Sequence, residues 1–171
     1  MRSSISFTFQ KPGVADAELE RNARETILKL LYAASGDAPR LAAAGADVGM
    51  VPKDGGFLTG LPIPSTLPSW ITSIDIDFYT NEFARTGFRG GLNWYRNIDR
   101  NWGLMAPFAG AKVMVPSLYV TGDRDLVAGF RGMNKLIANL RELFRNCTAQ
   151  SCCRVAVTGP SRSARQRLIP P

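Results

Sequence analysis

Two short stretches of the sequence carry side chains that could take part in acid–base or nucleophilic chemistry. Tyr95 lies on an expected helix and offers a phenol, which can donate a hydrogen bond. Thirty residues later comes Asp125, which shares an acidic turn with Asp123 just after an expected strand. The sequence contains no histidine, the residue that most often serves as a base near neutral pH. These residues could belong to a hydrolytic site that lacks its usual base.

Each of these side chains also has an ordinary structural explanation. An inward-facing Tyr on a helix is more often a core residue whose hydroxyl has a single partner. An Asp in a turn commonly accepts hydrogen bonds from the nearby backbone. Strand ends in α/β folds nevertheless collect ligands and catalytic acids. Spacing alone does not separate Asp123 from Asp125, and both explanations stay open.

The hydrophobic periodicity predicts a mainly helical chain with one short buried strand. Ser73 is expected to cap the second helix and Gly87 to end it. The third helix is expected to place four side chains in one broad sector: Leu92, Tyr95, Asp99 and Trp102. A strand, an acidic turn and a helix in succession are typical of an α/β unit. The expected helices cover residues 14–34, 73–85, 91–102 and 132–144, and the strand covers residues 117–121.

A long segment rich in Gly and Pro, residues 45–69, separates the first two helices. A connection of this length within a domain is usually functional or mobile. Two interpretations are equally consistent with it: a surface insertion, or a loop that lines a substrate tunnel.

Charge and cysteine are concentrated at the end of the sequence. The formal net charge is +7, but residues 145–171 hold five Arg and no acid, so residues 1–144 carry only +2. Because residues 1–144 are nearly balanced in charge, this distribution argues against nucleic-acid binding by that part of the chain. Residues 146–171 lack a sustained period and are expected to form a disordered basic tail. The cysteines, expected to be reduced thiols without a metal, are Cys147, Cys152 and Cys153.

No apolar run is long enough to cross a bilayer, and the first residues lack the apolar stretch of a secretory signal. A cytoplasmic location is therefore expected.

Residues 82–97 closely resemble the cap domain of plant soluble epoxide hydrolases, a family of the α/β-hydrolase superfamily. The resemblance continues through residues 101–112 and the turn 122–127, and residues 9–15 and 31–39 look like the start of the same cap. It implies an α/β-hydrolase fragment, mainly a helical cap with an incomplete core sheet. The domains expected on this basis are the cap (1–110), a partial core (111–145) and the basic tail (146–171).

The resemblance also implies a reaction, the hydrolysis of small lipophilic epoxides to vicinal diols. In that family an Asp nucleophile opens the epoxide and forms an ester, which water hydrolyses with a His as base. Two cap tyrosines stabilise the developing alkoxide. Tyr95 matches one of them, and Asp125 matches the Asp that orients the His. The expected substrate contacts are Phe88, Trp94 and Trp102, with no cofactor and no metal.

The sequence departs from the family pattern in ways that bear on activity. Ile5 stands about where the second cap tyrosine is expected. The nucleophile segment and the His are missing, so we expect a catalytically incomplete fragment truncated at both ends. The alternative is a non-catalytic cap module that binds ligands or partner chains.

Overall fold

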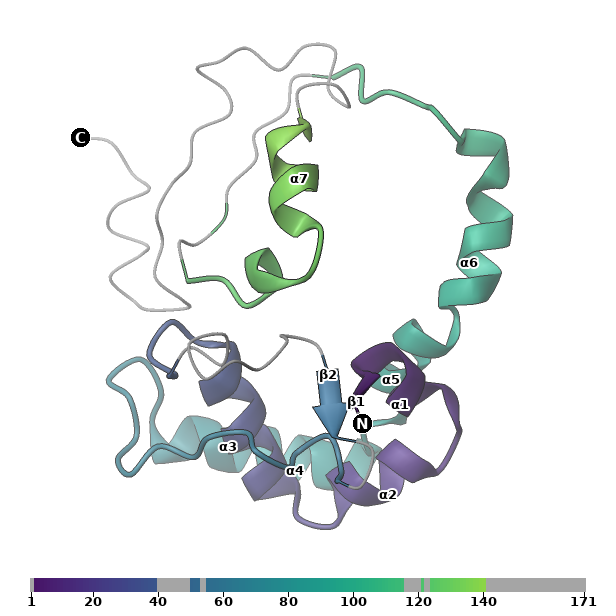
Figure 1. Ribbon diagram of the computed structural model, residues 1–171. Coiled ribbons are helices and arrows are strands. Elements are labelled where there is room, and N and C mark those ends of the chain that lie inside the picture. The colour runs from purple at the N-terminus through teal and green to yellow at the C-terminus, as the bar shows by residue number, and fades with distance from the viewer. Residues whose placement is uncertain (1, 40–49, 53–54, 116–120, 122–123, 141–171) are drawn as a thin grey trace, which may run out of the picture.

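The computed structural model describes residues 2–39, 50–52, 55–115, 121 and 124–140, and they are mainly helical, as the sequence predicts. Figure 1 shows α1 to α5 gathered with a small sheet, while α6 leads away from them. The elements in chain order are β1 (Arg2–Ser4), α1 (Ile5–Gln10), α2 (Val14–Glu20), α3 (Ala23–Ala34), β2 (Met50–Pro52), α4 (Ser73–Thr86), α5 (Arg89–Arg96), α6 (Ile98–Met105), the 3-10 turns η2 (Ala106–Phe108) and η3 (Val127–Gly129), and α7 (Met133–Ala138).

The small sheet joins two distant parts of the chain that the sequence analysis leaves without structure. β1 and β2 pair antiparallel, with Arg2 opposite Pro52 and Ser4 opposite Met50. This pairing ties the N-terminal residues to the segment that follows α3. The predicted core strand lies almost wholly outside the described residues, as do the last residues of the fourth predicted helix and the whole basic tail with its cysteines.

One hydrophobic core holds the first five helices together. α3 lies against α4, and α5 lies against α1 and α2. Burial of these apolar side chains is the main favourable term for the fold. The core contains residues from α1 to α5 and from the loop before α4: Phe9, Ala15, Leu19, Ile27, Ile71, Ile76, Phe88 and Leu92.

The single helix predicted over residues 14–34 is wrong, because the structure divides it into α2 and α3. Asn22 caps α3, and its side chain accepts a hydrogen bond from the Glu25 N–H at 3.1 Å. The Thr26 hydroxyl donates to the Leu19 carbonyl at 2.8 Å across the break. Asn favours such caps over helix interiors, so hydrophobic spacing alone misses the break.

The helix predicted over residues 91–102 is also divided, into α5 and α6. The Asn97 side chain donates to the Asn93 carbonyl at 2.8 Å, and Asn97 forms the junction. The predicted common sector is therefore wrong: Leu92 is buried in the core, whereas Trp102 is 84% exposed. A local side-chain hydrogen bond to the backbone has outweighed the helical period.

The predicted bounds of the second helix are close to those observed, but its predicted cap is wrong. Thr72, not Ser73, is the N-cap of α4, in a reciprocal capping box with Asp75. The Asp75 N–H donates to the Thr72 hydroxyl at 3.2 Å, and Asp75 accepts from the Thr72 N–H at 2.8 Å. Gly87 ends the helix as predicted, with a φ of 69° that favours glycine.

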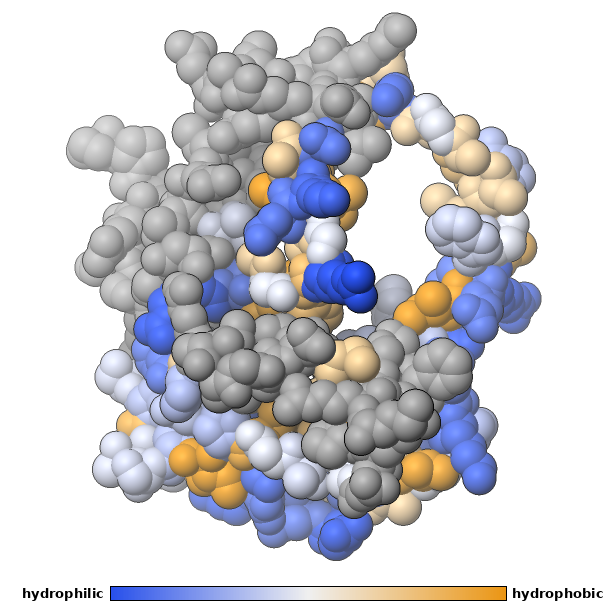
Figure 2. Space-filling model, viewed as in Figure 1, coloured by the Kyte–Doolittle hydropathy of each residue, from blue (hydrophilic) through white to orange (hydrophobic). Residues whose placement is uncertain are grey.

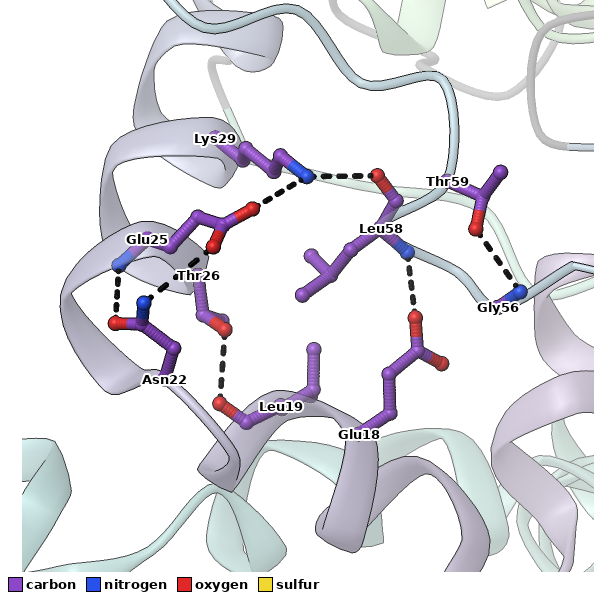
Figure 3. Close-up of polar contacts among 9 residues, drawn as sticks. All are labelled: Glu18, Leu19, Asn22, Glu25, Thr26, Lys29, Gly56, Leu58 and Thr59. Atoms are coloured by element: carbon purple, nitrogen blue, oxygen red, sulfur yellow. Dashed lines mark hydrogen bonds and ion pairs between the residues drawn. The ribbon is translucent and has the colours of Figure 1, made fainter.

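The described part of the Gly/Pro-rich segment is bound to α2 and α3. Glu18 on α2 accepts hydrogen bonds from the Phe57 and Leu58 N–H groups at 2.9 and 2.8 Å. Lys29 on α3 pairs with Glu25 and donates to the Leu58 carbonyl (Figure 3). A Cβ at Gly56 would meet the Glu18 carboxylate, so a larger residue at this position would displace the side chain that binds the loop.

An ion pair joins α5 to α2. Arg96 Nη2 lies 2.5 Å from Asp16 Oδ2, and the two side chains are only 11% and 14% exposed. Asp16 also accepts from the Gly13 N–H at 2.9 Å, at the start of α2. The hydrogen bond from Arg96 is the main cause that lowers the pKa of the Asp16 carboxyl.

We predict that Glu18→Gln lowers the free energy of unfolding by about 1–2 kcal/mol, because the amide has one oxygen in place of two and so leaves one of the two loop N–H groups without an acceptor. Urea unfolding followed by circular dichroism measures the change. The matched control is Glu82→Gln, which removes an exposed ion pair with Arg85 and should cost less than about 0.5 kcal/mol. Equal losses in the two variants would contradict the anchoring role of Glu18.

We predict that Asp16 makes the stability of the fold sensitive to acid. Its pKa is lower in the folded chain than its ordinary value of 3.8, so its contribution is present above that value. The contribution is lost as the pH falls through the folded-state pKa. Unfolding free energies measured between about pH 5 and pH 2 should therefore fall more steeply for the unmodified chain than for Asp16→Asn. Parallel curves would show that the ion pair does not couple to folding.

Candidate functional site

Tyr95 lies on α5 at the edge of a small aromatic cluster. Its ring meets that of Phe9 edge to face, with centroids 4.9 Å apart, and Phe9 meets Phe57 in the same way at 4.8 Å. We call Phe9, Phe57 and Tyr95 the Phe9 cluster. Edge-to-face packing is the preferred geometry of aromatic pairs, and it fixes how each ring is turned. The loop held by Glu18 and the helix that carries Tyr95 therefore meet through Phe9.

The backbone around Tyr95 is held to α1 by two hydrogen bonds. Gln10 Nε2 donates to the Tyr95 carbonyl at 2.7 Å. In return, Arg96 Nε donates to the Phe9 carbonyl at 3.1 Å. Each of two neighbouring residues on α1 thus contacts one of two neighbouring residues on α5.

The phenol of Tyr95 remains accessible at this position. Tyr95 is 41% exposed, and none of the described residues forms a hydrogen bond with the Tyr95 hydroxyl. A tyrosine hydroxyl with this freedom can donate to a ligand oxygen. The packed ring and the accessible donor suit a group that stabilises developing negative charge.

Asp125 lies in a turn before η3 and is exposed. Its Oδ1 accepts a hydrogen bond from the Val127 N–H at 2.7 Å. This is the local turn contact expected if Asp125 has an ordinary structural role. Arg124 donates to the Ala38 carbonyl at 3.3 Å, so the turn touches the segment after α3. None of the described contacts joins Asp125 to Tyr95, and Asp123 lies outside the described residues. The role of Asp125 stays a prediction.

The three expected substrate contacts occupy different environments. Phe88 is only 5% exposed and stacks on Phe83 with ring centroids 4.6 Å apart. Trp94 and Trp102 are 78% and 84% exposed. Phe88 thus contributes to the core, whereas the two Trp rings are accessible to a ligand or a partner. Their roles as substrate contacts stay predictions.

A cavity of about 430 Å³ lies between α2, α3 and the loop after β2, and Phe9, Phe57 and Tyr95 are not among its lining residues. Its lining includes Glu18, Glu25 and Lys29, whose charges already pair with one another or with the loop backbone (Figure 3). An apolar ligand would gain little from such walls, so the cavity is a poor candidate for a lipophilic substrate site.

No pattern in the sequence points to the residues that surround Tyr95. Phe9 and Gln10 fall in a segment that the resemblance covers, but no spacing pattern links them to Tyr95, 85 and more residues away. Phe57 lies in a segment without periodicity. Among the described residues, no three His, Cys, Asp or Glu side chains gather as they would around a metal ion. None of the helices in the described ranges has the length and apolar character that a membrane crossing requires.

Comparisons with known proteins relate the chain to one family. No family model matches the sequence. Epoxide hydrolase A of Mycobacterium tuberculosis is 44% identical over 122 residues, which are 71% of this chain and 37% of that protein. Epoxide hydrolase 1 of Siraitia grosvenorii is 39% identical over 129 residues, 75% of this chain and 37% of that protein. The solved epoxide hydrolase of an endophytic Streptomyces has a TM-score of 0.83 at 29% identity, covering 98% of this chain and 50% of its own.

The chain thus spans little more than a third of the length of these two curated relatives, a fifth of the mouse protein that also matches, and half of the solved structure. Bacterial, plant and mammalian proteins all match, so the similarity does not single out the plant subtype. The helical architecture of the described residues agrees with a cap fragment. Over the residues that match, the chain is similar to a mainly helical part of epoxide hydrolases, which are α/β-hydrolases.

Proposed function

We propose that this chain supplies the cap side of an epoxide-binding site, in which the Tyr95 hydroxyl donates a hydrogen bond to the oxygen of a small lipophilic epoxide. The observation that carries the proposal is the geometry of Tyr95. Its ring is packed on Phe9, while its hydroxyl has no hydrogen-bond partner among the described residues. A donor that is already oriented costs little to align when an oxygen arrives.

The reaction that the family resemblance implies needs more than this donor. It requires an Asp nucleophile and a His base, and the sequence contains no histidine. We therefore propose that the 171-residue chain binds lipophilic epoxides without turning them over. Within a complete site, Asp125 would orient the base, and Phe88, Trp94 and Trp102 would contact the substrate. A plant-like subtype, a cytoplasmic location and the lack of nucleic-acid binding stay predictions.

A second candidate function is a non-catalytic module that binds a partner chain. It is favoured by large apolar side chains exposed on and around α6, the arm on the right of Figure 2. Exposed apolar patches of this kind commonly mark interaction sites. The exposed side chains are Trp94, Ile98, Trp102, Leu104, Met105 and Phe108.

We predict that the purified chain has no epoxide hydrolase turnover, because it lacks a histidine base. The measurement is diol formation from styrene oxide, compared with buffer and with heat-treated protein. Turnover above both backgrounds that Tyr95→Phe abolishes would contradict the prediction and would require a base other than His.

We predict that Tyr95→Phe weakens the binding of styrene oxide about fivefold, the usual effect of one lost hydrogen bond. Titration followed by NMR measures the dissociation constant. The matched control is Tyr79→Phe on α4, since Tyr79 is 42% exposed and so equally accessible. The control should bind as the unmodified chain does. Equal affinities for Tyr95→Phe and Tyr79→Phe would refute the proposed role of Tyr95.

A further inference from the structure

The contacts between α1 and α5 form a reciprocal arrangement around Tyr95. On one side the Gln10 side chain donates to the Tyr95 carbonyl at 2.7 Å. On the other side the Arg96 side chain donates to the Phe9 carbonyl at 3.1 Å. Between these two hydrogen bonds the rings of Phe9 and Tyr95 are in contact. The two backbones are therefore fixed on both sides of the ring pair.

Arg96 is itself held in place from two directions. Its guanidinium forms a two-point contact with Asp16, at 2.5 and 3.4 Å, and a further bond to Asn93 Oδ1 at 3.1 Å. Because the guanidinium group is planar, contacts that fix its two Nη atoms also fix the direction of its Nε–H. Here that direction is the Phe9 carbonyl. Lysine offers no equivalent geometry, because its ammonium is a single point charge on a flexible stem.

We propose that Gln10, Arg96 and Asp16 are positioning residues that hold the Tyr95 phenol in the orientation needed to bind an epoxide oxygen. The proposal rests on the proposed function for its purpose, but its geometry can be tested without a ligand. Gln10 fixes the Tyr95 backbone directly. Asp16 acts indirectly. It orients the Arg96 guanidinium, which binds the Phe9 carbonyl and so holds the residue whose ring contacts Tyr95.

The ligand-free test follows the surroundings of the Tyr95 ring. The chain is labelled with 3-fluorotyrosine, and the four tyrosine signals are assigned in the fluorine NMR spectrum by Tyr→Phe variants. Gln10→Leu, Arg96→Lys and Asp16→Asn should each shift or broaden the Tyr95 signal and leave the Tyr79 signal unchanged. The matched control is Arg85→Lys, which alters an exposed ion pair on α4 and should leave the Tyr95 signal in place.

The variants differ in how much they disturb the fold. The Gln10 bond is exposed, so Gln10→Leu should retain the circular dichroism of the unmodified chain even if Asp16→Asn does not. A folded Gln10→Leu variant with an unshifted Tyr95 signal would overturn the proposal. So would a Tyr95 signal that moves as far in Arg85→Lys as in Arg96→Lys.

The ligand-dependent test asks whether Gln10 acts through Tyr95. Gln10→Leu should weaken styrene oxide binding about threefold to fivefold in the presence of Tyr95, and should have no effect in a Tyr95→Phe background. An equal loss in both backgrounds would overturn the proposal, because Gln10 would then act independently of the phenol. If Tyr95→Phe alone leaves binding unchanged, the proposed function is wrong, and the fluorine signals still decide whether the positioning contacts exist.

Discussion

The ion pair between Arg96 and Asp16 is the interaction on which the arrangement around Tyr95 depends. It joins the end of α5 to the start of α2, and the same guanidinium reaches the Phe9 carbonyl of α1. Both partners are largely buried, so the loss of either would leave a charge without compensation in a poorly hydrated place. The pair therefore fixes how three short helices meet. None of these helices is long enough to be stable alone, because helices under about a dozen residues are marginal in water.

A second constraint places the loop after β2 against this group of helices. The Glu18 carboxylate binds two consecutive backbone N–H groups, which brings the Phe57 ring onto Phe9. The Phe9 cluster is thus supported from the loop on one side and from α5 on the other. This double support gives a physical reason for a partly exposed tyrosine to keep one orientation. The described loop residues are therefore held to the helices and are not a loose surface insertion. That the segment lines a substrate tunnel stays a prediction.

The sequence predicts the existence of most helices better than their ends. Apolar spacing identified the helical stretches, but Asn22 and Asn97 divide two of them by hydrogen-bonding the local backbone. Tyr95 was found because the residues around it resemble a known family. Gln10, Asp16 and Phe57 were not found, because their contacts join positions 39 to 85 residues apart, and hydrophobic periodicity reports only on neighbouring turns of one helix. The environment of Phe88 was missed for the same reason, since its burial depends on how α4 and α5 meet the core.

The most direct test of this account is a through-space measurement between the rings of Phe9 and Tyr95. Proton NMR of a chain labelled at Phe and Tyr detects nuclear Overhauser effects only between protons that lie close in space, so an edge-to-face contact between two rings is visible. With ring centroids 4.9 Å apart, the account predicts a strong cross-peak between the two rings in the unmodified chain. It also predicts that this cross-peak weakens in Asp16→Asn while the Phe78–Tyr79 cross-peak of α4 persists. A folded chain without a Phe9–Tyr95 cross-peak would contradict the account.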